Sequence, residues 1–349
     1  IPVSTVDAAY MIAPGIGYIH LERFGATSGK EVHDAIAKLQ GEGMKKLMLD
    51  LSVNGGGYLG AAVEVAGEFL PGGSLVVYTQ GRTGKDSQLR AGSNGLFHEG
   101  PLAVIVDEYT ASAAEIVSGA VQDHDRGIIV GRRTFGKGLV QRPVELPDGS
   151  MIRLTVSHYY TPSGRCIQKP YVKGEKDKYN EDLNTRFTHG ELMHIDSIHL
   201  DSTKVYSTLE KHRTVYGGGG IMPDIFVPLD TTSYTPYYRA ISRNNLIQQT
   251  ALRFTDENRK ALLRRYKSFD DFLNSYTIPA AVVDGIEKEA AKKDIKPKDE
   301  AERKDAREDM FFMLKALVAY NVWDRNEYFR IINQKNDMVK RALEELQKQ

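Results

Sequence analysis

A serine stands in a sequence context that could support nucleophilic catalysis. The apolar run Leu102 to Val106 predicts a buried strand, and the residues after Ser112 have the apolar periodicity of a helix. Ser112 is therefore expected where a strand passes into a helix, and the unpaired N–H groups at a helix start can receive an oxyanion. A lone serine at a helix start is most often a capping residue, so the chemistry depends on what else lies nearby.

Lys137 and Gln141 supply the groups that a serine nucleophile needs. Residues 139–146 are rich in apolar side chains and predict a strand, and in an extended chain Lys137, Leu139 and Gln141 point to the same side. A buried lysine can act as a base, because desolvation disfavours the ammonium form. We expect the apolar neighbours Phe135, Leu139 and Val140 to provide that burial, and Gln141 to hold the amine by a hydrogen bond.

Several motifs, in this order along the chain, resemble those of the carboxy-terminal processing (tail-specific) serine peptidases. They are Leu49-Asp50-Leu51 through Asn54-Gly55-Gly56-Gly57, Thr110-Ala111-Ser112-Ala113-Ala114-Glu115, Phe135-Gly136-Lys137-Gly138 with Gln141, and Gly219-Gly220-Ile221-Met222-Pro223-Asp224. The resemblance runs over roughly residues 1–230. It implies Ser112 as nucleophile, Lys137 as base and Gln141 as the residue that orients the amine. It also implies oxyanion donors from the Ala113 N–H and from Gly56 or Gly57. Where the family often has Arg-Gly-Asn, this chain has Ser52-Val53-Asn54.

The resemblance also implies an activity and a setting. We expect a serine endopeptidase that hydrolyses peptide bonds near the C-termini of protein substrates through an acyl-enzyme, without cofactor or metal. Its partners would be polypeptide tails, and its compartment the bacterial periplasm or cell envelope. The family usually carries a PDZ domain, which binds peptide C-termini by strand addition. None fits before the first expected core strand at Ile16, and a start at Ile1 suggests a processed chain.

Strand-like and helix-like segments alternate through the first part of the chain. Strands are expected at 16–21, 46–51, 75–78, 102–106 and 127–131, and helices at 31–39 and 59–70. This spacing predicts a parallel sheet with helices on its faces. The turn Pro147-Asp148-Gly149 predicts an added hairpin. With the resemblance, the expected fold is an α/β, crotonase/ClpP-like protease core; residues 1–14 show little pattern, and residues 80–100 look like an exposed loop.

The composition changes near residue 240. Glycine nearly vanishes, charged residues with Ala and Leu dominate, and Phe311, Leu314, Leu317 and Val318 follow helical periodicity. We therefore expect two domains, a peptidase core at 1–235 that lacks a PDZ domain and a helical domain at 236–349. The helices could also mediate contacts in a homo-oligomer, which the sequence leaves open.

Composition excludes several classes of protein. Lys plus Arg equals Asp plus Glu, 46 each, which argues against a nucleic-acid-binding protein. No run approaches the roughly 18 apolar residues of a transmembrane segment. The single cysteine, Cys166, can form neither an internal disulfide nor a zinc cluster. His189, His194 and His199 recur every five residues, which aligns them on neither a helix nor a strand, so we expect no metal site.

Three rival interpretations are weaker. Gly131 to Lys137 fits the start of a P-loop, but Gly138 replaces the magnesium-binding hydroxyl, and a strand rather than a helix is expected next. A catalytically silent peptide-binding protein on the same scaffold is the main alternative, although the serine, lysine and glutamine are all present. An acyl-CoA enzyme with a crotonase-like core would leave the serine and lysine unexplained.

Overall fold

The computed structural model describes residues 4–81, 86–172 and 174–349 of the chain. They form two compact units, Ile1–Leu229 with Met338–Gln349, and Asp230–Asp337. The expected domains 1–235 and 236–349 stay a prediction. The compact units differ from them in two respects: the boundary falls after Leu229, and the C-terminal segment Met338–Gln349 belongs to the first unit. Within the first unit, Lys46 Nζ donates to the Leu346 carbonyl at 2.8 Å, and Val339, Ala342 and Leu346 are buried.

The first unit is built on a mostly parallel sheet. Within the described residues it has six strands in the order β1-β2-β3-β6-β7-β12. Only β1 at one edge is antiparallel to its neighbour. The strands are β1 (Val6–Ala13), β2 (Ile16–Leu21), β3 (Lys46–Asp50), β6 (Leu102–Val106), β7 (Ile128–Gly131) and β12 (Ile225–Phe226). Every residue of β6 is buried, as a central parallel strand requires. The α/β class expected from the sequence is confirmed.

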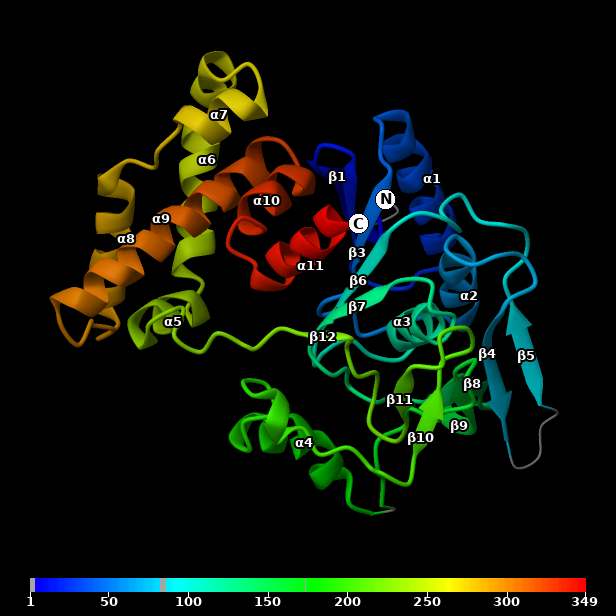
Figure 1. Ribbon diagram of the computed structural model, residues 1–349. Coiled ribbons are helices and arrows are strands. Elements are labelled where there is room, and N and C mark those ends of the chain that lie inside the picture. Colours follow the sequence, from blue (N-terminus) through cyan, green and yellow to red (C-terminus); the bar gives the residue numbers. More distant parts are fainter. Residues whose placement is uncertain (1–3, 82–85, 173) are drawn as a thin grey trace. The chain divides into compact units, whose positions relative to one another are not determined.

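Helices cover both faces of this sheet. The helices α1 (Ser28–Gly41), α2 (Leu59–Gly67) and α3 (Ala113–Asp123) lie on one side of it, and α11 (Asp337–Lys348) lies across the sheet from them (Figure 1). The amphipathic pattern explains α1, which buries Val32, Ile36 and Leu39 along one stripe. In contrast, α3 is buried at every residue. Its first turn therefore begins inside the protein, directly after the β6 end.

A second sheet carries the predicted hairpin. In the described chain it has four antiparallel strands, in the order β5-β4-β9-β8. They are β4 (Leu75–Gln80), β5 (Ser87–Arg90), β8 (Leu139–Glu145) and β9 (Met151–Tyr160). Apolar and polar residues alternate along β9, which suggests that Ile152, Leu154 and Val156 face the core. These three side chains are instead 40%, 47% and 39% exposed. The opposite face, with Met151 and Arg153, lines a pocket instead.

Several elements escaped the sequence patterns. They are β1 in the stretch without pattern, β5 within the supposed loop 80–100, and α4 (Lys176–Thr188), η1 (Ile195–Ser197), β10 (Val205–Ser207) and β11 (Thr214–Tyr216) in the polar stretch that follows Cys166. Residues 82–85 of the loop lie outside the described residues. The polar helix α4 is held by charged contacts: Arg186 pairs with Glu191 at 2.7 Å, and Lys169 pairs with Asp182 at 3.0 Å.

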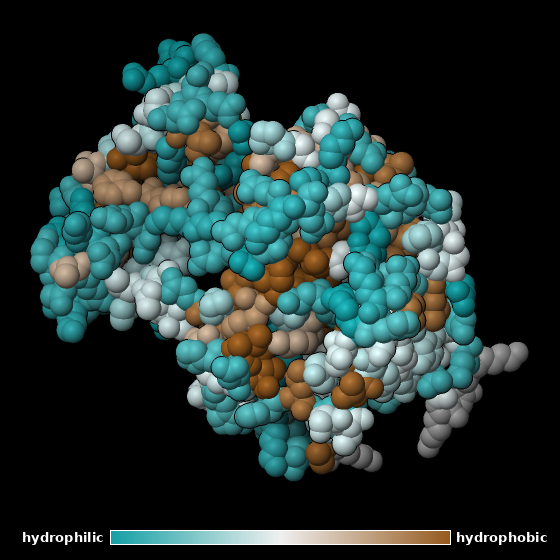
Figure 2. All heavy atoms as spheres, viewed as in Figure 1, coloured by the Kyte–Doolittle hydropathy of each residue, from teal (hydrophilic) through white to brown (hydrophobic). Residues whose placement is uncertain are grey.

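The second unit is helical, so the expected C-terminal helical region is confirmed. Its helices are α5 (Pro236–Arg243), α6 (Leu246–Arg265), α7 (Phe269–Ser275), α8 (Ala280–Lys292), α9 (Glu300–Val322) and α10 (Arg325–Ile332). They enclose their own apolar core, which includes Phe272, Met310 and Leu314. On the face drawn in Figure 2, hydrophilic residues cover most of these helices. Within the residues that the structure describes, no helix combines the length and apolar character that a membrane crossing requires.

Candidate active site

Ser112 lies at the junction of β6 and α3, as the sequence predicts. It is the N-cap residue of α3, but its hydroxyl makes no capping hydrogen bond. Its backbone has a φ of 58° and a ψ of −115°, a conformation that a residue with a side chain rarely adopts. Ser112 nevertheless takes part in a capping box with Glu115, whose carboxylate accepts from the Ser112 N–H at 2.8 Å. The strained turn leaves Ser112 half-buried at the wall of a pocket.

The turn before Ser112 is fixed by a buried aspartate. The Asp107 carboxylate accepts hydrogen bonds from the N–H groups of Val53, Tyr109 and Thr110, each at 3.0 Å. Burial raises the pKa of Asp107, although these hydrogen bonds act in the opposite direction. One carboxylate thus joins the loop after β3 to the loop after β6. Both loops follow the carboxyl ends of neighbouring parallel strands, where sites in α/β proteins are usually built.

A single buried carboxylate holds the Ser112 turn and the Lys137 loop together. Glu115 Oε2 accepts from the Ser112 N–H at 2.8 Å and from the Lys137 N–H at 2.9 Å. Its Oε1 accepts from the Gly136 N–H at 2.7 Å and from the Thr134 hydroxyl at 2.5 Å. Glu115 is fully buried; burial raises its pKa, while these four donors act the other way. Two loops far apart in sequence therefore converge on one oxygen atom.

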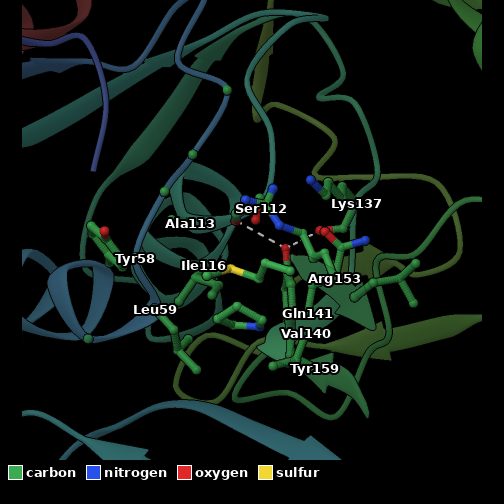
Figure 3. Close-up of a pocket in the computed structure, with 17 residues that line it drawn as sticks. Tyr58, Leu59, Ser112, Ala113, Ile116, Lys137, Val140, Gln141, Arg153 and Tyr159 are labelled. Carbon is green, nitrogen blue, oxygen red and sulfur yellow. Dashed lines mark hydrogen bonds between the residues drawn. The ribbon is translucent and has the colours of Figure 1, made fainter. Parts of the chain in front are cut away.

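A buried tyrosine makes a second link between the same two residues. The Tyr159 hydroxyl on β9 is shared between the carbonyl oxygens of Ser112, at 3.0 Å, and Lys137 (dashed lines in Figure 3). Burial raises the pKa of Tyr159 well above its ordinary value, so this hydroxyl stays protonated and able to donate. Glu115 thus accepts hydrogen bonds from the backbone N–H groups of Ser112 and Lys137, and Tyr159 donates to their backbone C=O groups.

Lys137 does not lie in a strand, contrary to the expectation from alternation. It precedes β8, in a loop where Gly136 has a φ of +85°, and a β-bulge interrupts the register between Val140 and Gln141. A bulge shifts the side-chain alternation, so the two-residue period does not relate Lys137 to Gln141. Both residues nevertheless line the same pocket. Phe135 is not among the lining residues, and its ring packs on Tyr179 instead.

The glycines after Asn54 approach the Ser112 turn closely. A Cβ atom on Gly56 would lie 2.7 Å from Ser112 Cβ and 2.9 Å from the Ala113 nitrogen, so only glycine fits. Gly56 and Gly57 also have φ angles of +94° and +152°. The Gly56 N–H donates to Asn54 Oδ1 at 2.8 Å. The buried Asn54 also accepts from the Ala111 N–H at 2.9 Å through its carbonyl, which ties the glycine loop to the residues before Ser112.

All six residues proposed from the sequence meet at one pocket of about 840 Å³ (Figure 3). Its lining is Gly55, Gly56, Gly57, Tyr58, Leu59, Gly60, Ser112, Ala113, Ile116, Lys137, Leu139, Val140, Gln141, Pro143, Met151, Arg153 and Tyr159. Ser112, Lys137 and Gln141 lie there beside Ala113, Gly56 and Gly57. A hydroxyl, an amine, backbone N–H groups and apolar side chains around a cavity are the parts that acyl transfer needs.

Sequence reasoning missed three residues of this arrangement. Glu115 could have been found, because Ser112 and Glu115 have the spacing of a capping box. Tyr159 and Arg153 gave no comparable signal, since their role depends on the pairing of β9 with β8 rather than on any local motif. The stretch Gly131 to Lys137 is followed by the strand β8 and not by a helix, so the P-loop interpretation gains no structural support.

Two family models match parts of this chain. Residues 15–175 match the family described as peptidase family S41, and residues 237–324 match a family of unknown function. The chain is 43% identical over 154 residues to a carboxyl-terminal-processing protease of Synechocystis sp., covering 44% of this chain and 36% of that protein. It is 36% identical over 186 residues to a probable CtpA-like serine protease of Staphylococcus aureus, covering 51% of this chain and 37% of the relative.

Among solved structures, the photosystem II D1 C-terminal processing protease is similar, with 28% sequence identity and a TM-score of 0.45. That match covers 65% of this chain and 49% of the other. The chain spans little more than a third of the length of the two curated relatives above. The similarity to peptidase family S41 thus rests on residues 15–175 of this chain.

Proposed function

We propose that this chain is a serine endopeptidase that cleaves near the C-termini of protein substrates. The observation that carries the proposal is the shared hydrogen bonding of Glu115 Oε2 to the N–H groups of Ser112 and Lys137 beside one pocket. This arrangement supports a hydroxyl nucleophile and an amine base acting on one substrate. The family and the processing proteases among the relatives point to the same reaction.

In the proposed reaction the uncharged Lys137 amine removes the Ser112 proton as Oγ attacks the scissile carbonyl carbon. The tetrahedral intermediate collapses when its C–N bond breaks, and the Lys137 ammonium returns a proton to the departing amine. The acyl-enzyme ester is then hydrolysed by a water molecule that the same amine activates. Gln141 orients the amine through a hydrogen bond. No cofactor enters any of these steps.

The oxyanion would be held by two backbone donors. The Ala113 N–H is at the first turn of α3, where the helix leaves its N–H groups unpaired. Of the two candidate glycines, Gly56 already donates its N–H to Asn54 Oδ1, which favours Gly57 as the second donor. Loss of one such donor typically lowers the rate about 10²–10³-fold.

Substrate, partner and compartment follow from the family rather than from the geometry. We propose polypeptide tails as substrates and the bacterial periplasm or cell envelope as the compartment, which cell fractionation would test. Contacts between copies through the helical unit remain a further proposal, which sedimentation would test. A PDZ domain elsewhere in the native protein would supply tail selection by strand addition.

The test is cleavage of an unfolded protein substrate by purified variants. We expect Ser112→Ala and Lys137→Ala to abolish turnover while the circular dichroism spectrum and melting temperature stay close to those of the wild type. Ser118→Ala and Lys45→Ala are matched controls, since both residues lie outside the pocket lining. Proteolysis retained in either active-site variant would refute the assignment.

A serine-directed covalent probe separates the enzyme from the catalytically silent peptide binder. Labelling of the wild type at Ser112, lost in Lys137→Ala, supports the enzyme. Peptide binding without any labelling would favour the silent alternative.

A further inference from the structure

The pocket around Ser112 is lined by two basic residues and by no acidic residue among those described. Its lining contains Lys137 and Arg153, and no aspartate or glutamate among the described residues. Glu115 lies behind the wall of the pocket, where its oxygens are occupied by four donors. If Lys137 serves as the base, Arg153 is a second cation for which the proposed mechanism has no use.

Arg153 reaches the pocket from the middle of β9. It is two residues from Met151, which lines the same pocket, so both share one face of the strand. Opposite it on β8 is Pro143, another lining residue. In Figure 3 the Arg153 side chain extends across the pocket toward Ser112. Arg153 therefore lies on the substrate side of the wall.

Arg153 also lacks the partners that other arginines of this unit have. The guanidinium groups of Arg132, Arg165 and Arg186 are buried and paired with Glu108, Asp123 and Glu191 at 2.6–2.7 Å. Within the described part of the chain, Arg153 has neither an ion pair nor a hydrogen bond of this kind, and it is exposed. Among the described residues, no ion pair or hydrogen bond of this kind gives Arg153 a structural role.

We propose that Arg153 binds a carboxylate of the peptide substrate next to the scissile bond. A guanidinium offers two parallel N–H donors, which match the two oxygens of a carboxylate. The carboxylate would be either the C-terminal α-carboxylate of the tail or an Asp or Glu side chain close to the cleaved bond. The proposal deepens the proposed function, since it makes Arg153 a determinant of which tails are cleaved.

Binding to a chain that cannot cleave tests this proposal without relying on turnover. In the Ser112→Ala chain, fluorescence anisotropy measures the affinity of labelled ten-residue peptides made of Ala and Val. One pair differs only at the terminus, free acid against amide. A second pair, both amidated, differs only in Glu against Gln near the middle. Arg142→Gln is the matched control, because Arg142 lies on β8 beside the hairpin partner of Arg153 but does not line the pocket.

We expect the charged member of at least one pair to bind about tenfold more tightly than its neutral counterpart, as one charge-assisted contact predicts. The pair that shows the difference identifies the source of the carboxylate. Adding Arg153→Gln should abolish the preference, whereas adding Arg142→Gln should leave it. The preference should also shrink at high salt, because Arg153 is exposed.

The proposal is overturned if neither pair shows a preference, if no peptide binds, or if the preference survives Arg153→Gln. Cleavage by the wild-type chain is measured separately. A chain that shows the Arg153-dependent preference but cleaves nothing would overturn the proposed function and leave the carboxylate site standing.

Discussion

Replacing Glu115 by glutamine should weaken the hydrogen bonding that holds Ser112 and Lys137 in place, while changing the side-chain volume very little. The carboxylate accepts four hydrogen bonds, two at each oxygen. A glutamine has one oxygen, so in either orientation of the amide two of the four donors face an NH₂ group instead. Each buried donor left without a partner costs about 1–3 kcal/mol, which gives a loss of about 2–6 kcal/mol in the free energy of unfolding.

The catalytic effect should exceed what this loss of stability explains. In either orientation of the amide, the Ser112 turn and the Lys137 loop lose part of the hydrogen bonding that fixes them, and a displacement of about 1 Å can lower a rate about 10²-fold. We therefore expect kcat/KM to fall about 100-fold at a temperature where the variant is still folded. Urea unfolding followed by circular dichroism gives the stability, and cleavage of a fluorogenic peptide gives the rate.

Asp123→Asn is the matched control for this experiment. Asp123 is a fully buried carboxylate on the same helix, which accepts from Arg165 and from the Ser163 N–H at 2.7 and 2.9 Å. It contacts neither of the two catalytic candidates directly. We expect it to destabilise the protein without the specific loss of rate. A Glu115→Gln variant that is destabilised yet keeps the wild-type kcat would refute the idea that this carboxylate positions the site. An unchanged stability would refute the count of lost hydrogen bonds.

Three further perturbations have definite expected outcomes. Tyr159→Phe removes the hydroxyl shared by the carbonyls of Ser112 and Lys137. We expect urea unfolding to show a loss of about 1–3 kcal/mol in the free energy of unfolding, and steady-state kinetics to show a lower kcat with little change in KM. An unchanged kcat would contradict the positioning role of Tyr159. Gly57→Ala places a Cβ 2.0 Å from the Phe24 carbonyl oxygen at a φ of +152°, so the melting temperature and the activity should both fall sharply. Gly55→Ala is the control, because its Cβ would meet nothing within 4 Å and the variant should fold. Equal behaviour of the two variants would disprove the close approach at Gly57. Burial raises the pKa of Glu31, but hydrogen bonds from Thr27, Ser4 and the N–H groups of Val6 and Thr5 outweigh it and lower the pKa to about 2. Because the folded pKa lies below the unfolded one, Glu31 stabilises the protein above about pH 5, and this contribution is lost as the pH falls toward 2. Urea midpoints of the wild type and Glu31→Gln should therefore differ at pH 6, and the difference should shrink steadily as the pH falls from about 5 toward 2; a constant difference would exclude the linkage.

The parts of the fold that the sequence predicts are those where burial leaves a local pattern. The strand β6 was expected with its observed bounds because its five residues are all apolar and all buried. The strand β1 was missed because most of its residues are only half-buried at the edge of the sheet, which gives no clear alternation. The helix α4 was missed because charged contacts, such as that of Arg186 with Glu191, hold its segment in place of an apolar stripe.

The residues of the candidate site also fall into those that a local sequence pattern predicts and those that it does not. Ser112 could be placed from the strand before it and the helix after it, whereas the expected role of Gly56 and Gly57 came from the family resemblance. The position of Lys137 beside Ser112 could not, because it depends on a loop, a bulge and one buried carboxylate rather than on the period of a strand. The roles of Tyr159 and Arg153 depend on which strands pair, and pairing across long sequence separations has no signature in a single chain.

The helix α11 belongs to the first unit although it follows the second unit in sequence, and this order has a consequence for folding during synthesis. Its first turn packs on the main sheet, where Met338 Sδ lies 3.6 Å from an Arg132 guanidinium nitrogen, and Lys46 holds its last turn. A nascent chain releases all the strands of that sheet before any of residues 230–337, and α11 emerges only after them. The surface that α11 covers thus stays bare while residues 230–337 are made, which makes the uncovered sheet a natural substrate for chaperones until α11 emerges.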